Sequence, residues 1–481
     1  MFVFKFNFKL FNSSVLHFSN AYKSQSAFVT AIGVHPTNVP YFKKKHGLEN
    51  ITDEQIKSTA MFCEMIGISK QEIKENPKFL KISLKSLDCQ HTLMSEIGFK
   101  NIDAYLLMSY RKCMNRPVSL LKAYGFIDDD TNVAEHLLSH LKPTPENIRT
   151  DDISDHNVLF DIHKTLLIRY LMWRFKASQD QVESFLRQSG AKTIRSFRFL
   201  CECIALARDL GISEDQMLTK YGYILGAYPK YPLTTISETR EICGITMREL
   251  YLRDPMLVTV PPDNIKIIKD ILESNNISRE SLLNYVRVLT LSPTTVKLRF
   301  EEIEAIPELK VLKTHPRILC LIGHHNRARS RLSFLKDMKL NCANLGILGD
   351  HSVSFDAHIK EGVDENSIMA LKRFMQSILK RDYREFEKDL KRHPFYLKVP
   401  FLQIQETLQY LEERNYEIPT ILKAIQILLY PKETIIKTFK NMDSNLEIKL
   451  ARLTDLQKLN LALYLMEKRH HFTGNGIWKN S

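Results

Sequence analysis

The sequence predicts an all-α fold, a solenoid built from helix-turn-helix repeats. Two observations lead to this expectation. A phrase with a leucine at a fixed place returns along the chain at intervals of 30 to 32 residues, which is the pattern of a stacked helical repeat. Glycine and proline, which loop-rich β folds use heavily, number only 16 and 18 among 481 residues. With 44% apolar and 26% charged residues, the chain can bury a large core.

The repeat is clearest in the middle of the chain. Four segments can be written in register: GISEDQMLTKYGYILGAYP from Gly211, GITMRELYLRDPMLVTVPP from Gly244, NISRESLLNYVRVLTLSP from Asn276 and KTHPRILCLIG from Lys313. One position in them is always leucine, and a helix breaker follows it four residues later. The leucines are Leu225, Leu257, Leu289 and Leu319, and the breakers are Pro229, Pro261, Pro293 and Gly323. We expect the four leucines to occupy equivalent buried positions in successive units.

The glycine, threonine and proline residues of one unit predict its local structure. A helix ends at Gly244, because glycine adopts the left-handed cap conformation without a Cβ clash. Thr246 then caps the next helix by accepting a free backbone N–H. That helix must end near Asp254-Pro255, since proline lacks the N–H and disfavours a helical residue before it. Each unit is expected to be helix, turn, helix and short turn, and units must stack because one unit cannot bury its apolar stripe alone.

Interruptions of the repeat predict the domain boundaries. Residues 143–157 hold four acids and two prolines, and residues 343–366 hold three glycines. We therefore expect N-terminal repeats at 49–142, a linker or long loop at 143–157, central repeats at 158–342, an irregular loop at 343–366 and a basic helical module at 367–481. No stretch approaches the ~18 consecutive apolar residues of a membrane span.

The first 48 residues are expected to be a mitochondrial transit peptide or a disordered segment. They contain six lysines and no acid, and Glu49 is the first acid of the chain. An import signal must be cationic and amphipathic, and acids oppose both properties. Two features depart from the pattern: arginine is absent, and the phenylalanines of residues 2–8 alternate with period two. We expect this segment to contribute nothing to the solenoid, and the protein to act in the mitochondrial matrix.

Three phrases of the repeat carry a family resemblance. Leu-Gly-Ile-Ser at 210–213, Asp-Pro-Met-Leu at 254–257 and His-Pro-Arg-Ile-Leu at 315–319 resemble the repeat signature of the mitochondrial transcription termination factor (mTERF) family, in particular its animal and insect members. The resemblance runs from about Ile51 to Phe439. It implies a left-handed superhelix along duplex DNA with arginines in the major groove. In the best-known branch, everted bases stack on aromatic and arginine side chains, but the motif matches only scaffold positions of this chain.

The charge distribution indicates a polyanionic partner. The net charge of +13 divides into +6 for residues 1–48, −1 for residues 49–290 and +8 for residues 291–481. A basic part attached to a neutral part is the usual electrostatic footprint of a nucleic-acid binder. Because helical repeats present one edge of each unit to a common surface, one or two cations per unit can follow a phosphate backbone.

The candidate nucleic-acid-binding residues are therefore basic side chains of the C-terminal part. The first set is Lys297, Arg299, Lys313, Arg317, Arg327, Arg329, Arg331, Lys336 and Lys339, with Lys310 beside it. The second set is Lys380, Arg381, Arg384, Lys391 and Arg392, in a cluster that also holds Lys372, Arg373 and Lys388. For any one of them the alternative is a solvated helix edge. Tyr285 and Phe334 lie near the first set, and core packing is the alternative for both.

Two classes of function remain. The first is a protein that binds double-stranded mitochondrial DNA and terminates or regulates transcription, as a monomer on the nucleic acid and with other mitochondrial transcription factors as further partners. The second is a mitochondrial ribosomal-RNA-binding ribosome-assembly factor, a role that other branches of the mTERF family play. An enzyme is not expected, because no phosphate loop and no Gly-x-Ser-x-Gly occurs. We expect no cofactor and no metal, since none of the eight cysteines forms a Cys-x-x-Cys.

Overall fold

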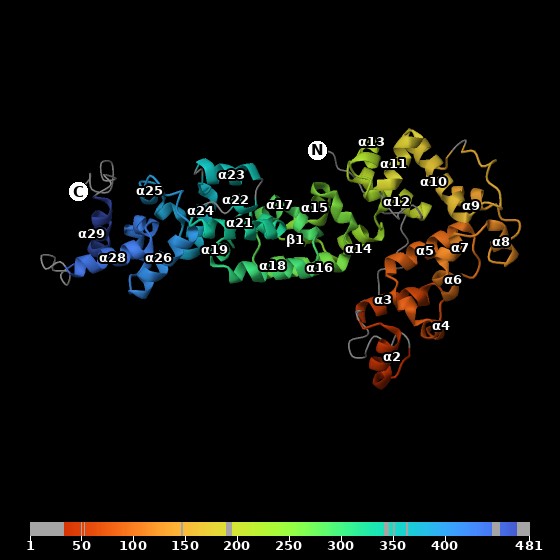
Figure 1. The fold of residues 1–481 in the computed structure, drawn as a ribbon, viewed down its shortest axis with the longest axis horizontal. Coiled ribbons are helices and arrows are strands. Elements are labelled where there is room, and N and C mark those ends of the chain that lie inside the picture. Colours follow the sequence, from red (N-terminus) through yellow and green to blue (C-terminus); the bar gives the residue numbers. More distant parts are fainter. Residues whose placement is uncertain are drawn as a thin grey trace. The chain divides into compact units, whose positions relative to one another are not determined.

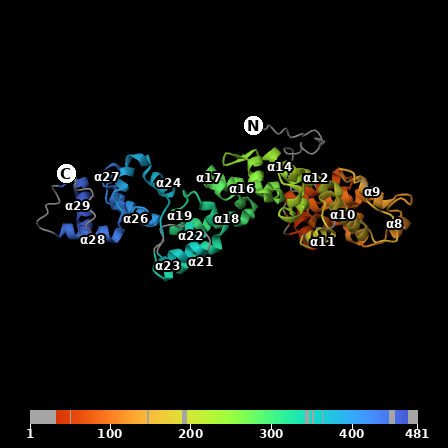
Figure 2. The same cartoon turned by 90° about the horizontal axis from the view of Figure 1, so that it is seen from above.

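The computed structural model describes residues 33–49, 51, 53–145, 148–188, 195–340, 346–349, 352–361, 364–444 and 453–468. Of the residues that the structure describes, 69% are helical, which confirms the all-α prediction. In the described part the strands are β1 (Glu241–Ile242) and β2 (Ile245–Thr246), which pair around a tight turn. No helix found there has the length and apolarity to cross a membrane. The chain divides into two compact units, Met1–Pro229 and Lys230–Ser481, drawn in Figures 1 and 2.

The first unit is a series of short helices. Its α-helices are α2 (Val39–His46), α3 (Asp53–Met65), α4 (Lys70–Glu75), α5 (Leu84–Ile97), α6 (Ala104–Met108), α7 (Tyr110–Met114), α8 (Val118–Ala123), α9 (Val133–Ser139), α10 (Leu159–Phe175), α11 (Gln179–Gln188), α12 (Phe197–Asp209) and α13 (Glu214–Thr219). Its 3₁₀ helices are η3 (Pro36–Asn38), η4 (Pro77–Lys81) and η6 (Ile224–Gly226).

The second unit continues with the same kinds of element. Its α-helices are α14 (Lys230–Glu238), α15 (Met247–Arg253), α16 (Pro262–Ser274), α17 (Arg279–Asn284), α18 (Pro293–Ala305), α19 (Pro307–Lys310), α20 (Ile318–Gly323), α21 (His325–Asp337), α22 (Gly346–Gly349), α23 (Ser352–Glu361), α24 (Ile368–Leu379), α25 (Glu387–Leu390), α26 (Phe401–Glu413), α27 (Ile418–Lys423), α28 (Lys432–Asp443) and α29 (Asp455–Glu467). Its 3₁₀ helices are η7 (Pro255–Thr259), η8 (Val286–Thr290), η9 (Tyr383–Glu385) and η10 (Ile425–Leu429).

The repeating unit has three helical elements, where two were predicted. A long helix such as α16 is followed by a short helix, α17, and then by a 3₁₀ helix, η8. The segment expected to be a short turn is thus a regular 3₁₀ helix. Proline starts η7, because its fixed φ suits the first helical position and its missing N–H would have no partner there. In the second unit the long helices α16 and α18 pack side by side, as both views show (Figures 1 and 2).

The four repeat leucines are buried as predicted. Leu225 is 1% exposed, and Leu257, Leu289 and Leu319 are fully buried. The first three lie in the 3₁₀ helices η6, η7 and η8, and Leu319 lies in the corresponding helix α20. The apolar residues of this short helix therefore form the recurring core of the repeat.

The carbonyl groups at the end of three of these turns, η4, η6 and η10, share one arrangement. A long polar side chain on or just before the long helix donates a hydrogen bond to them. Gln55 donates to the Leu80 carbonyl at 3.4 Å, and Gln403 donates to the Leu429 carbonyl at 2.8 Å. Arg195 reaches the Leu225 carbonyl in the same way. These bonds satisfy the last carbonyls of a helix, which have no partner within the helix itself.

A second recurring bond caps the start of the turn. The residue before the turn accepts a hydrogen bond from a backbone N–H two positions later. Asp254 accepts from the N–H of Met256 at 3.1 Å. At the equivalent places His315 Nδ1 accepts from Arg317 at 3.0 Å, and His393 Nδ1 accepts from Phe395 at 3.2 Å. An imidazole nitrogen accepts a hydrogen bond only when it carries no proton, so both histidines must be neutral in the folded state.

One buried carboxylate joins distant parts of the first unit. Glu96 on α5 is fully buried. It accepts hydrogen bonds from the Ser196 hydroxyl at 2.7 Å and from the backbone N–H groups of Phe197 and Arg198 at 2.8 and 3.0 Å. Burial raises the pKa of this carboxyl group. Glu96 thus supplies the N-terminal partner of α12 from about one hundred residues away in sequence.

The predicted interruptions have mixed outcomes. The described residues of 143–157 form no helix, and they are tied to the first unit by an ion pair between Asp155 and Lys122 at 2.7 Å. They are a long loop of that unit. The prediction of an irregular loop at 343–366 is wrong, because the described part of this segment contains the helices α22 and α23. Ile347 and Leu348 are buried there, so tertiary packing overrides the two glycines of α22.

The amino-terminal prediction is partly outside the described residues, which begin at 33. Residues 33–48 contain η3 and α2, and Val34 and Leu48 are buried. The expectation that everything before Glu49 contributes nothing to the solenoid is therefore wrong for this last stretch. Residues 33–48 reach the core through the apolar side chain of Leu48, although the lysine-rich sequence of this segment resembles an import signal.

We predict that the repeat leucines carry the stability of the second unit. Leu289→Ala should lower the free energy of unfolding by about 2 to 5 kcal/mol, because it leaves a cavity in a fully buried site. Leu298→Ala is the matched control, since Leu298 on α18 is 54% exposed and its loss should cost less than about 0.5 kcal/mol. Urea unfolding followed by circular dichroism measures both. Equal losses would contradict the assigned register.

The histidine caps predict a loss of stability in acid. Burial, together with Arg317 and Arg373, lowers the pKa of His315 to about 4 from an ordinary value of 6.5, and burial lowers the pKa of His393. The unfolded chain therefore takes up protons below pH 6.5 before the folded chain does. The stabilising contribution is complete above pH 6.5 and falls by up to about 3 kcal/mol for His315 as the pH approaches 4.

Asparagine can accept the same N–H bond without titrating. His315→Asn should therefore flatten the dependence of the unfolding free energy on pH between 6.5 and 4. His156→Asn, at an exposed histidine, is the control. Its unfolding free energy should depend on pH in the same way as that of the unaltered chain. Thermal melts at a series of pH values measure this, and an unchanged profile in His315→Asn would show that the cap does not titrate.

Candidate nucleic-acid interface

The predicted cations lie on or beside six α-helices and one 3₁₀ helix of the second unit. Lys297 and Arg299 are on α18, and Lys313 and Arg317 lie between α19 and α20. Arg327, Arg329, Arg331 and Lys336 are on α21, with Lys339 just after it. Lys380 ends α24, and Arg381, Arg384, Lys391 and Arg392 lie around η9 and α25. The structure thus separates the candidates into an α18–α21 group and an α24–α25 group.

Two of the predicted binding residues serve the fold. Arg331 is 9% exposed and donates hydrogen bonds to the carbonyls of Ile347 at 2.7 Å and Leu348 at 3.3 Å. Its guanidinium carbon lies 4.7 Å from the ring centroid of Phe355 on α23. Arg299 donates to the Ile322 carbonyl at 2.7 Å. The hydrogen bonds of Arg331 hold its side chain against α22, and a role of Arg331 in nucleic-acid binding stays a prediction.

Carboxylates of α18 and α19 neutralise several other cations of the α18–α21 group. Lys313 pairs with Glu304, and Lys310 lies 3.7 Å from the same carboxylate. The hydrogen bond from Lys313 holds the pKa of Glu304 below its usual value. In the same way, Lys336 pairs with Glu308 at 2.7 Å and Arg329 lies 3.9 Å from Glu302. The basic residues of this group are therefore interleaved with acids on neighbouring elements.

Cations and acids of the α24–α25 group pair mostly within the group. Arg384 pairs with Asp382 at 2.7 Å, and Lys391 pairs with Glu387 at 2.5 Å. The hydrogen bond from Arg384 lowers the pKa of Asp382 to about 2. Arg392 pairs with Asp389 at 3.1 Å, and Arg373 pairs with Glu280 on α17. Lys380 and Arg381 are exposed and make no ion pair with any described residue.

The two aromatic residues near the α18–α21 group have different surroundings. The Tyr285 ring packs closely against Gly323, where an added Cβ would lie 2.2 Å from it, and its centroid is 5.6 Å from that of His324. Tyr285 is therefore part of the packing between repeats. Phe334 is 44% exposed on α21, and its ring meets Phe355 edge-on at 6.1 Å.

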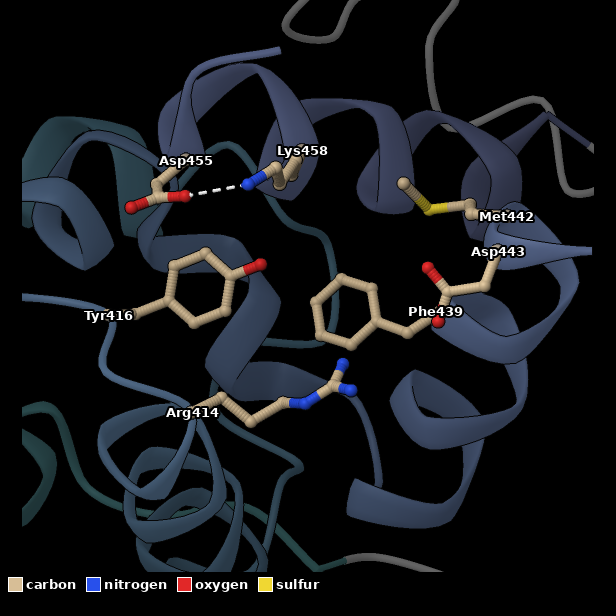
Figure 3. A pocket seen from close by; sticks show the side chains of 7 residues that line it. All are labelled: Arg414, Tyr416, Phe439, Met442, Asp443, Asp455 and Lys458. Carbon is tan, nitrogen blue, oxygen red and sulfur yellow. Dashed lines mark hydrogen bonds and ion pairs between the residues drawn. The ribbon is translucent and has the colours of Figure 1, made fainter. Parts of the chain in front are cut away.

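A pocket between the ends of α26, α28 and α29 was not predicted from the sequence (Figure 3). Its volume is about 390 Å³. The Arg414 guanidinium lies 5.2 Å from the Phe439 ring centroid, and the nearly parallel Tyr416 and Phe439 rings are 6.1 Å apart. Asp455 and Lys458 pair at 3.0 Å across its rim. The pocket is lined by Arg414, Tyr416, Phe439, Met442, Asp443, Asp455 and Lys458, so its two carboxylates balance its two cations. No local motif could reveal residues brought together over this sequence distance.

The comparisons with known proteins support the family resemblance. No family model and no solved structure matches the chain. The chain is similar to a Drosophila melanogaster protein named transcription termination factor 5, mitochondrial, with 28% identity over 447 residues, which is 91% of this chain and 80% of that protein. This match confirms the resemblance to animal mTERF proteins that the repeat phrases indicated. It also supports the predicted mitochondrial localisation.

The different roles of two arginines on α21 can be measured. Arg331→Met should lower the free energy of unfolding by about 1 to 3 kcal/mol, because the buried carbonyls of α22 lose their donors. Arg329→Met should cost about 1 kcal/mol at most, since its side chain is 67% exposed and its partner is distant. Chemical denaturation of both variants tests the assignment. Equal losses of unfolding free energy in the two variants would contradict a structural role for Arg331.

Proposed function

We propose that this chain binds double-stranded mitochondrial DNA and thereby terminates or otherwise regulates transcription. The observation that carries the proposal is the similarity to a protein named a mitochondrial transcription termination factor, which extends over 91% of this chain. A likeness of that extent must include most of the repeat array. It therefore supports a shared scaffold and, with it, the role that the relative's name states.

The charge and architecture of the second unit support binding to a polyanion. The C-terminal residues 291–481 carry a net charge of +8, and among the predicted cations Lys297, Lys339, Lys380 and Arg381 are exposed. Stacked repeats hold such side chains at regular intervals along one body. A phosphate backbone offers charges at regular intervals too, and each cation that neutralises a phosphate releases a bound counterion.

The proposed action requires binding and no chemical step. A protein held on the duplex by several phosphate contacts obstructs a polymerase for as long as it remains bound. Stable occupation therefore suffices to stop or slow transcription. Specificity for one site would come from contacts to base edges or from the shape of the duplex, because phosphate contacts carry no sequence information directly.

We predict that the purified chain binds fragments of mitochondrial duplex DNA with a logarithm of affinity that falls linearly with the logarithm of salt concentration. Filter binding across a salt series measures this. In a transcription assay on a template that contains the most tightly bound fragment, truncated transcripts should end at that fragment. The same template with the fragment scrambled is the control.

Ribosomal RNA in the same binding series tests the second class of function. Weaker binding to RNA than to the best duplex fragment supports the proposal. Tighter binding to RNA than to every duplex fragment, with no truncated transcripts, would overturn the proposal in favour of a ribosome-assembly factor.

A further inference from the structure

The cations of the second unit differ in whether a carboxylate already accompanies them. In the α18–α21 group, Lys310 and Lys313 share Glu304, and Lys336 pairs with Glu308. If such a cation turned to a phosphate, its carboxylate would stay nearby and repel the phosphate. The attraction that these side chains offer to a nucleic acid is therefore reduced, even though each ion pair is exposed and weak.

The α24–α25 group distributes its charges in another way. Three of its acids, Asp382, Glu387 and Asp389, pair with cations two to four residues away in sequence. Other cations of the group take no part in these pairs. Lys380, Arg381 and Lys388 lie within nine residues of one another, and all three are exposed. They form no ion pair with a described residue. Lys372 is exposed as well and acts electrostatically on Asp382.

The elements that carry these side chains pack together. Helix α24 contacts η9, and η9 contacts α25, so the three elements lie together, and α24 and α25 are neighbours in Figure 1. Lys380 itself takes the left-handed conformation, with φ of 51°, as the residue that ends α24. The chain turns sharply there, which places Lys380 and Arg381 on an exposed bend.

We infer that the phosphate contacts of this protein concentrate on the α24–α25 patch, defined as Lys372, Lys380, Arg381 and Lys388, and not on the arginine-rich helix α21. The inference rests on the proposed function, because it assigns the surface that a nucleic-acid backbone touches. In the α18–α21 group, Lys297 and Lys339 are also exposed and form no ion pair with a described residue, but they lie 42 residues apart in sequence. The four cations of the patch lie within 17 residues of one another, so the inference rests on available cations that are clustered, whereas charge density along the sequence ranks α21 at least as highly.

A pair of matched double variants tests the inference. Lys380→Gln with Arg381→Gln removes two positive charges from the patch, and Lys310→Gln with Lys313→Gln removes two from around Glu304. The change in net charge is identical. Each lost phosphate contact reduces the slope of log affinity against log salt by ~0.9, so the patch variant should lose about 1.8 from its slope and bind about 60-fold more weakly at 0.1 M salt. The control should keep its slope within about 0.5.

The measurement is fluorescence anisotropy of the full chain on one mitochondrial duplex fragment at several salt concentrations. Circular dichroism melts of both variants establish that each is folded, and Lys388→Gln provides a further patch variant away from the end of α24. A loss of slope that is equal in the two double variants, or larger in the Lys310 and Lys313 variant, overturns the inference while the proposed function stands. Absence of salt-dependent duplex binding by the unaltered chain overturns the proposed function and this inference together.

Discussion

The structure depends on the burial of the short helix that closes a repeat, which is a 3₁₀ helix in η6, η7 and η8 and an α-helix in α20. A segment with an apolar residue such as Leu257 or Leu289 fills the space between helices, and its side chain is withdrawn completely from water. The same burial withdraws backbone carbonyls that a short helix cannot satisfy itself. The bonds from Gln403 to Leu429 and from Arg195 to Leu225 resolve this conflict. Packing of the apolar side chain and satisfaction of the backbone are thus two requirements of one element.

The repeat was predictable from the sequence because its controlling residues are local. Leucine recurs with the period of the unit, and Thr246 caps α15 as expected, with its hydroxyl accepting from Glu249 at 3.2 Å. The 3₁₀ helix in the turn was not predicted. A proline followed by apolar residues indicates that the preceding helix ends, but it does not indicate the backbone geometry of the residues that follow. Helices α22 and α23 were missed for another reason: the glycines of that segment oppose a helix locally, and only contacts with distant residues such as Arg331 offset them.

The surroundings of the individual candidate cations could not be predicted from the sequence. Counting charges locates the basic half of the chain, yet it gives Arg331 and Arg329 equal weight. Their difference arises from folding: Arg331 faces α22 and Phe355, while Arg329 faces solvent near Glu302. The partner of a cation is usually on another element, so the sequence cannot show which cations remain available to a ligand.

Stacking of repeats and binding of a polyanion place competing demands on basic residues. Neighbouring elements rich in cations repel one another, and carboxylates between them reduce that repulsion. In the second unit, Arg279 pairs with Glu249 at 3.1 Å and joins α17 to α15, and Arg373 pairs with Glu280 and joins α24 to α17. Each such pair weakens the attraction of its cation for phosphate. Around α25 the acids pair with cations close in sequence. Lys380, Arg381 and Lys388 nearby are exposed and form no ion pair with a described residue. Where the acid and the cation lie on different elements, as in the pairs of Arg279 and Arg373, the ion pair contributes to the cohesion of the stacked elements.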